Sequence, residues 1–234
     1  MPNRSAVALA AAYALAGAAW AARGRSSAVF GPSVWHGTKG RQAIALTFDD
    51  GPGPATPRFL EVLADYGAPA TFFQVGSHVL RHPGIARSVL AAGHEIGNHS
   101  HTHRNFALRP GLIDADFARA QSAIGEVTGV SPALLRAPYG VRWFGFREMQ
   151  AKLHVQGVMW TVIGLDWKLP AAAIADRVLA RVRDGGIICL HDGRGMRPEP
   201  DVTATLEAVR RIVPALQGAG YHFETVSQLL CPTT

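Results

Sequence analysis

The stretch Ala43-Ile44-Ala45-Leu46-Thr47-Phe48-Asp49-Asp50, followed by Gly51-Pro52, decides how this chain folds. Its apolar and β-branched run predicts a buried strand over residues 43–48, and the acidic pair with the Gly-Pro turn marks the end of that strand. In parallel α/β folds, chemistry gathers at the carboxyl ends of strands. The acidic pair is therefore a candidate functional site, although an acidic turn that caps a helix would look similar.

Outward from this stretch, short apolar runs alternate with helical patterns. Gly67, Gly93 and Gly129 stand just past predicted helix ends, where glycine commonly caps a helix. The alternation predicts an α/β fold with a parallel sheet of about seven strands, in one domain over residues 41–230. The predicted strands are 43–48, 70–75, 95–98, 133–135, 158–163, 186–190 and 221–225. The predicted helices are 56–66, 83–92, 113–128, 144–153, 172–183 and 202–217, the last of them interrupted by Pro214.

The composition indicates an ordinary globular domain. The chain has 234 residues, of which 48% are hydrophobic and 17% charged, and a disordered chain would not have this balance. The net charge is +6, but the basic residues are spread along the chain without a cluster, so we expect no nucleic-acid partner. Cys189 and Cys231 are too few for a disulfide framework and leave open a single bridge.

The N-terminal segment, residues 1–30, contains an uncharged run over residues 6–22 in which 11 of 17 residues are alanine. As a helix it would span about 26 Å, slightly less than a hydrocarbon core of roughly 30 Å. The basic start and the Ala-x-Ala steps suit a cleaved secretory signal peptide, whereas Arg23 and Arg25 on the far side oppose the usual orientation. A membrane anchor through residues 6–22 and a helix packed on the domain are the alternatives. We expect an exported protein: secreted, periplasmic or anchored outside the cytoplasm.

Polar side chains stand just after the predicted strands. Because parallel strands end at the same edge of a sheet, these side chains should converge on one rim. They are Asp49-Asp50, His99, Arg136, Asp166 and His191-Asp192.

His99 and His103 are the candidate metal ligands. Their spacing of four places both on one face of a helical turn, with His101 pointing elsewhere. Together with one carboxylate of the acidic pair, they make a two-histidine, one-carboxylate set that leaves positions open for water and substrate. The sequence therefore predicts a divalent metal site.

Other strand-end residues suit acid–base catalysis on a sugar. Arg136 can fix a nearby carboxylate and lower its pKa, and His191 titrates near neutrality, as a general acid does. Tyr139 can line a groove and offer its backbone N–H to an oxyanion, while Asp166-Trp167 supplies an orienting carboxylate and an aromatic wall. The remaining histidines match no motif, and we expect them to be surface or structural residues. They are His36, His78, His82, His94, His154 and His222.

Five motifs in order resemble those of the polysaccharide deacetylases, the NodB-homology or carbohydrate esterase family 4 domain. They are Thr47-Phe48-Asp49-Asp50-Gly51-Pro52, His99-Ser100-x-x-His103, Arg136-x-Pro138-Tyr139, Asp166-Trp167 and Ile187-Ile188-x-x-His191-Asp192. The resemblance covers roughly residues 41–228. It implies a distorted (β/α) barrel and a divalent metal ion, usually zinc or cobalt. It also implies an enzyme that hydrolyses N-acetyl groups of amino sugars in peptidoglycan, chitin-like oligomers or surface glycans and releases acetate.

The resemblance also implies a role for each matching residue. Asp49 would be the catalytic base and His191 the catalytic acid. Arg136 would orient Asp49, whereas Asp166 would either hold Arg136 or tune His191. The remaining roles would be metal binding by Asp50, His99 and His103, and substrate binding by Tyr139 and Trp167.

Two positions depart from the family pattern. Ile163 stands where an aspartate is frequent, and Cys189 stands where a leucine is common, which would reshape the pocket for the acetyl methyl group. Neither departure removes a group that performs chemistry.

Two other functions compete with deacetylation: a catalytically silent carbohydrate-binding domain, and a metal-dependent esterase or amidase that acts on another acyl substrate.

Overall fold

β2 (Ala43–Asp49) is the centre of the fold. It runs between β3 (Thr71–Gln74) and β8 (Ile187–His191), and every residue of it is buried, as in parallel sheets that are covered on both faces. The structure is a computed structural model that describes residues 4–231. The first three residues of the predicted N-terminal segment thus lie outside the described residues.

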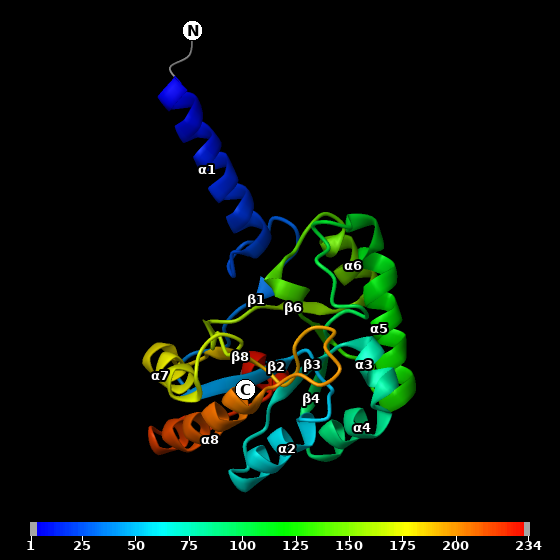
Figure 1. Cartoon of the computed structure of the whole chain (residues 1–234), viewed down its shortest axis with the longest axis vertical. Coiled ribbons are helices and arrows are strands. Elements are labelled where there is room, and N and C mark those ends of the chain that lie inside the picture. Colours follow the sequence, from blue (N-terminus) through cyan, green and yellow to red (C-terminus); the bar gives the residue numbers. More distant parts are fainter. Residues whose placement is uncertain (1–3, 232–234) are drawn as a thin grey trace.

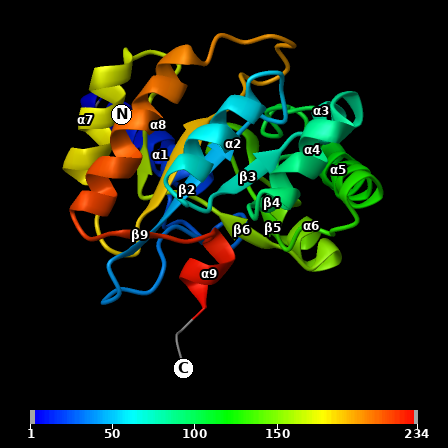
Figure 2. The same ribbon diagram turned by 90° about the horizontal axis from the view of Figure 1, so that it is seen from below.

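The strands curl into a distorted (β/α) half-barrel surrounded by helices (Figure 1, Figure 2). Eight parallel strands follow the order β1-β6-β5-β4-β3-β2-β8-β7, and β9 pairs with β2 beside this path. The predicted α/β fold is confirmed. The other strands are β1 (Ser33–Val34), β4 (Glu95–Asn98), β5 (Leu134–Leu135), β6 (Gln156–Val158), β7 (Val162–Ile163) and β9 (His222–Phe223).

The helices that cover the sheet follow the predicted ones within a few residues. They are α2 (Thr56–Asp65), α4 (Pro83–Ala91), α5 (Ile113–Thr128), α6 (Phe146–Leu153), α7 (Ala171–Arg181) and α8 (Thr203–Gly218). Pro214 lies inside α8 without ending it. Buried residues on both sides of this proline, Val213 and Leu216, hold the helix on the core, so tertiary packing overrides the local signal. Two short helices were not predicted, α3 (Gly76–Arg81) and α9 (Val226–Leu230), since neither is long enough to show a helical period.

The predicted strand 158–163 is wrong as a single element. It is divided into β6 and β7, which pair with different neighbours, β5 and β8. The carbonyl oxygens of Val158 and Met159 accept hydrogen bonds from the Arg136 guanidinium at 3.3 Å each instead of continuing a strand ladder. A buried cation from the neighbouring strand end therefore interrupts the run.

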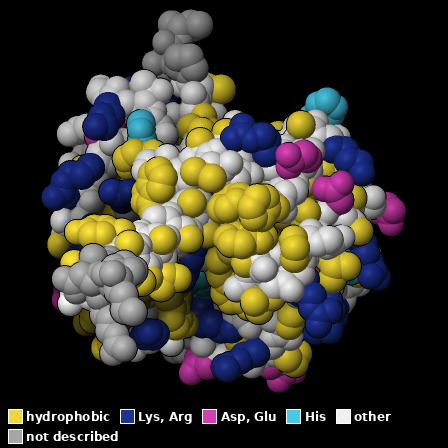
Figure 3. All heavy atoms as spheres, turned by 90° about the horizontal axis from the view of Figure 1, so that it is seen from above, with side chains coloured by type: hydrophobic (Ala, Val, Ile, Leu, Met, Phe, Trp, Pro, Cys, Tyr) yellow, Lys and Arg dark blue, Asp and Glu magenta, His cyan; other side chains and the backbone are white. Residues whose placement is uncertain are grey.

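The N-terminal helix α1 (Arg4–Arg23) stands away from the body of the protein (Figure 1). The residues from Val7 to Trp20 are exposed, and the face from which α1 projects is hydrophobic over much of its area and hollowed near its centre (Figure 3). Within residues 4–231, no helix combines the length and hydropathy needed to cross a membrane.

The sheet begins earlier in the chain than we predicted. The predicted domain starts at residue 41, whereas the first strand, β1, lies at residues 33–34. β1 pairs with β6, and His36 forms a bridge with Gly186 at the start of β8. Residues 33–36 therefore extend from β6 to the start of β8. Cys189 is buried and Cys231 exposed, and both are free thiols.

Candidate active site

Chemistry-bearing side chains from five strand ends meet in one cleft of about 1200 Å³. Asp49 ends β2 and lies directly opposite His191 at the end of β8. His99 follows β4, Arg136 follows β5 and Asp166 follows β7. All the predicted site residues line the cleft except Arg136, which contacts Asp49. Those lining the cleft are Asp49, Asp50, His99, His103, Tyr139, Asp166, Trp167 and His191.

Asp50, His99 and His103 bring three ligand atoms within 4.8 Å of one another. Nε2 of His103 lies 2.8 Å from Oδ1 of Asp50, and Nε2 of His99 lies 3.4 Å from the same oxygen. All three side chains are buried. The structure thus brings together the set that the sequence indicates.

The hydrogen bonds around this cluster leave its inner atoms without donors. Nδ1 of His99 donates to the Arg136 carbonyl oxygen at 2.8 Å, so Nε2 presents a lone pair. Oδ2 of Asp50 accepts from the Gly195 N–H at 2.8 Å, whereas Oδ1 is buried and faces the Nε2 atoms of His103 and His99. Buried lone pairs that face each other need a cation between them. Two imidazoles and one carboxylate fit a divalent metal ion, with positions left for water and substrate.

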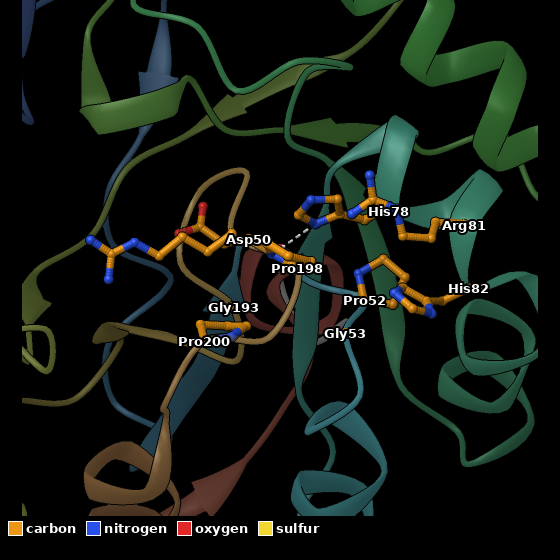
Figure 4. A pocket seen from close by; sticks show the side chains of 10 residues that line it. Asp50, Pro52, Gly53, His78, Arg81, His82, Gly193, Pro198 and Pro200 are labelled. Atoms are coloured by element: carbon orange, nitrogen blue, oxygen red, sulfur yellow. Dashed lines mark hydrogen bonds between the residues drawn. The ribbon is translucent and has the colours of Figure 1, made fainter.

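The backbone of Asp50 is held from behind by His78, a residue that sequence analysis assigned to no motif. Nδ1 of His78 donates to the Asp50 carbonyl oxygen at 3.0 Å (Figure 4), and Asp50 has a left-handed φ of 77°. Burial lowers the pKa of His78, which keeps the imidazole neutral. Both residues border a small pocket of about 10 Å³. The signal in the sequence was only the position of His78 after the second predicted strand.

The loop that carries His99 and His103 is not helical, contrary to the prediction from their spacing. Ser100 and His103 have left-handed φ values of 66° and 50°, which a helical turn does not allow. Asp116 of α5 accepts hydrogen bonds from the backbone N–H groups of His101 and Thr102, at 2.6 and 3.1 Å. An external carboxylate therefore shapes the turn that brings the two ligands together.

Arg136 lies beside Asp49 and is itself completely buried. Its Nη1 donates to Oδ1 of Asp49 at 2.6 Å and to Oγ1 of Thr47 at 2.7 Å, and its guanidinium stacks over the ring of Phe73. These contacts fix one oxygen of Asp49 and leave Oδ2 facing the cleft. Thr47 was not predicted as a site residue, because a threonine inside a strand carries no separate signal.

Asp166 contacts His191 and not Arg136, which decides between the two predicted roles. Its Oδ1 lies 2.8 Å from Nδ1 of His191, and its Oδ2 accepts from the His191 backbone N–H at 3.0 Å. Thr205 and Arg194, which sequence analysis missed, also bind its carboxylate, at 2.8 and 3.5 Å.

The contact between Asp166 and His191 favours the charged form of each residue: it raises the pKa of His191 and lowers the pKa of Asp166. Burial disfavours the imidazolium of His191, but the carboxylates of Asp166, Asp50 and Asp49 together outweigh it, Asp166 most of all, and raise the pKa of His191 to about 9. Burial likewise raises the pKa of Asp166, yet the neighbouring imidazolium brings it below its ordinary value. His191 is therefore protonated at neutral pH, as a general acid must be.

Tyr139 and Trp167 present aromatic surface at the cleft. Tyr139 is 53% exposed, and its ring lies 4.8 Å from the ring of His103; Trp167 is 43% exposed and lies 5.3 Å from His191, edge to face. Tyr139 also has a left-handed φ of 59°, which is uncommon for a residue with a large side chain. Exposed rings beside the cluster suit contact with the apolar face of a sugar.

Cys189 and Ile163, which depart from the family pattern, pair with each other in the β7–β8 ladder and line the cleft. The Cys189 thiol donates to Oδ2 of Asp49 at 3.5 Å. Burial raises the pKa of this thiol well above its usual range.

Asp192, next to His191, points away toward α2, where the Thr56 hydroxyl donates to it at 2.5 Å. Burial raises the pKa of Asp192 to about 7.

The arrangement places a base and an acid at adjacent strand ends beside a metal-binding group. Arg136 holds Oδ1 of Asp49, whereas Oδ2 accepts only the weak thiol donor of Cys189 among the residues that the structure describes and can also accept a proton from water. His191, held by Asp166, has a proton to give to a leaving group. This division of roles suits metal-assisted hydrolysis of an amide or ester.

Comparison with known proteins gives matches of one kind. The sequence model of a family described as "Polysaccharide deacetylase" matches residues 36–158. A chitooligosaccharide deacetylase of Bradyrhizobium sp. (strain ANU 289) is 36% identical over 200 residues, which are 81% of this chain and 91% of the relative. A peptidoglycan-N-acetylglucosamine deacetylase of Bacillus cereus is 34% identical over 207 residues, 84% of this chain and 92% of the relative.

Solved structures share the fold. A peptidoglycan N-acetylglucosamine deacetylase aligns with a TM-score of 0.77 and 28% identity, covering 84% of this chain and 91% of that one. A carbohydrate esterase family 4 pseudoenzyme from Bacillus anthracis also aligns with a TM-score of 0.77, at 25% identity over 87% of this chain and 70% of that one. Because a deacetylase and a pseudoenzyme share this fold, the fold alone does not distinguish an active protein from a silent one, whereas the site residues do.

Proposed function

The chain belongs to the polysaccharide deacetylase family, and we propose that it hydrolyses N-acetyl groups of amino sugars in a glycan and releases acetate. The observation that carries this proposal is the pairing of Asp49 with Arg136 and of His191 with Asp166 at adjacent strand ends beside one metal-binding group. A silent binding domain needs neither pair. The relatives named for chitooligosaccharides and peptidoglycan support glycans with N-acetylglucosamine as the substrates.

The metal is proposed to be zinc, with cobalt as a substitute. Proteins of this family depend on a metal ion, and two imidazoles with one carboxylate are typical zinc ligands. When bound by Asp50, His99 and His103, a divalent ion supplies Lewis acidity toward the acetamide carbonyl and toward water.

The residues of the chain would carry the proton transfers. Oδ2 of Asp49 accepts a proton from the attacking water while Arg136 holds the other oxygen of that carboxylate. The backbone N–H of Tyr139 is assigned to the oxyanion, and its ring with that of Trp167 to the sugar. His191 then protonates the departing amine, and acetate is released.

The test is acetate release from N-acetylglucosamine oligomers and from peptidoglycan by the full chain, after chelation and after addition of zinc or cobalt. We expect acetate only when metal is present. Asp49→Asn should lower turnover by about 10³-fold or more while one metal ion stays bound, because the base is lost and the ligands remain. His103→Ala should lose the metal in elemental analysis. Metal-loaded protein that releases no acetate from either glycan would overturn the proposal.

We also propose that the protein is exported. The support is the basic start, the alanine-rich run over residues 6–22 and the exposed position of α1 outside the domain. Fractionation of cells that produce the chain, with N-terminal sequencing, should find it outside the cytoplasm. Recovery in the cytoplasm alone would contradict this.

A further inference from the structure

Asp49, Cys189 and His191 form a second cluster of potential ligands beside the first. Their ligand atoms all lie within 4.8 Å of one another, and all three residues line the cleft. In the ladder between β2 and β8, Asp49 pairs with His191, and Cys189 is two residues earlier on the same strand. Since side chains alternate along a strand, Cys189 and His191 share a face. The cluster is thus built into the centre of the sheet.

Each of the two ionisable partners is held so that one atom stays available. Nη1 of Arg136 donates a hydrogen bond to Oδ1 of Asp49 at 2.6 Å. The remaining oxygen, Oδ2, lies 3.5 Å from Sγ of Cys189. Asp166 takes Nδ1 of His191 at 2.8 Å, which leaves Nε2. In metal sites of proteins, a ligating histidine commonly donates its other ring nitrogen to a carboxylate, as Nδ1 of His191 does to Asp166.

We propose that Asp49, Cys189 and His191 bind a second divalent cation of borderline or soft character, Zn²⁺ or Cd²⁺, when it is in excess, and that this ion inhibits the enzyme. On binding, the S–H proton of Cys189 and the Nε2 proton of His191 pass to solvent, and a metal–sulfur bond and a metal–nitrogen bond form. Thiolate selects for such cations over Mg²⁺ or Ca²⁺. Inhibition follows because the proposed base and acid both become ligands; this part rests on the proposed function, whereas the binding site itself does not.

The two sites should fill in sequence. Asp50, His99 and His103 already bring their ligand atoms together, whereas the second site must first lose the protons of a buried thiol and of the His191 imidazolium. The sites are adjacent, because Nε2 of His99, a ligand of the first site, lies 3.9 Å from Oδ2 of Asp49, a ligand of the second. Low metal would therefore activate and excess metal inhibit.

Cys189→Ser tests the proposal, with Cys231→Ser as the matched control. Serine keeps a hydroxyl donor toward Asp49 but removes the soft ligand, and Cys231 is the exposed second thiol. Each protein, loaded with one ion, is titrated with Cd²⁺ while the ultraviolet thiolate-to-cadmium absorption and the bound metal are measured. Inhibition by excess Zn²⁺ is measured relative to each variant's own activity, and thermal melting verifies folding.

The wild type and Cys231→Ser should bind a second ion with the thiolate absorption and lose activity in excess Zn²⁺. Cys189→Ser should bind that second ion about tenfold or more weakly, without the absorption, and resist inhibition. Equal second-ion binding and inhibition in Cys189→Ser, or a single bound ion in the wild type, would overturn the proposal. If no glycan is deacetylated but the absorption depends on Cys189, the site stands and only the proposed function fails.

Discussion

At the scale of single residues, neighbours in sequence have different surroundings and therefore different chemistry. Asp49 ends a strand and meets a buried guanidinium, whereas Asp50 turns to a left-handed φ of 77° and meets two imidazoles. Burial raises the pKa of Asp50, but His103 and His99 outweigh it and hold the pKa well below its ordinary value. One carboxylate is thus placed to move a proton and the other to stay ionised as a ligand.

Asp166→Asn should shift the alkaline limb of the activity profile to lower pH. The Asp166 carboxylate holds the pKa of His191 at about 9, and the acid works in its protonated form, so losing the negative charge lowers the pH at which that form disappears. The measurement is kcat/KM against pH. Thr205→Val, which removes a hydrogen bond to the same carboxylate but no charge, is the control and should shift the limb much less. An unchanged limb in Asp166→Asn would refute this assignment.

At the scale of elements, the proposed metal ligands depend on a helix that supplies none of them. Asp116 on α5 receives the backbone N–H groups of His101 and Thr102 and, at 2.5 Å, the Thr102 hydroxyl. It therefore replaces the hydrogen bonds that a helical turn would have provided. The spacing of four between the histidines is kept, but the conformation between them is set from outside.

Asp116→Ala should weaken metal binding about tenfold, because residues that orient ligands typically contribute this much to affinity. Asp114→Ala, on the same helix, removes only a surface ion pair with Lys152 at 3.5 Å and should leave the affinity unchanged. Competition with a chelator measures the affinity of both variants. Equal affinities would mean that the loop holds its shape without Asp116.

At the scale of the whole molecule, the segment after α1 is part of the domain. The buried side chain of Arg142 donates to the carbonyl oxygens of Gly24 and Ser27, the latter at 2.7 Å, and its backbone N–H donates to Ala22 at 2.9 Å. A boundary at residue 41, as the motifs suggest, would cut away these partners together with β1.

A chain that begins at Ala22 should unfold at nearly the same urea concentration as the full chain, because α1 is exposed up to Trp20. A chain that begins at Arg41 should lose about 3 kcal/mol or more, since Arg142 loses its carbonyl partners and β6 loses its pairing with β1. Circular dichroism in urea measures both. In the shorter chain, Arg142→Met should restore part of the loss, and full stability without residues 22–40 would contradict the prediction.

The sequence by itself determined the fold class and the family, and it predicted the main residues of the candidate site. Alternating apolar runs and helical patterns are local properties, and the motifs stand at strand ends, so the convergence of Asp49, His99, Arg136 and His191 on one rim follows from parallel pairing alone. Apart from the 158–163 run, the predicted strands and the predicted helices were confirmed within a few residues for the same reason.

Only the tertiary structure decided the contacts between segments distant in sequence. It showed that Asp166 tunes His191 rather than holding Arg136, that the 158–163 run is divided by the Arg136 guanidinium, and that the His99–His103 turn is not helical. It also placed the Cys189 thiol against Asp49 and residues 22–36 on the domain. These features depend on hydrogen bonds and charges whose partners lie far along the chain, which local periodicity and spacing do not encode.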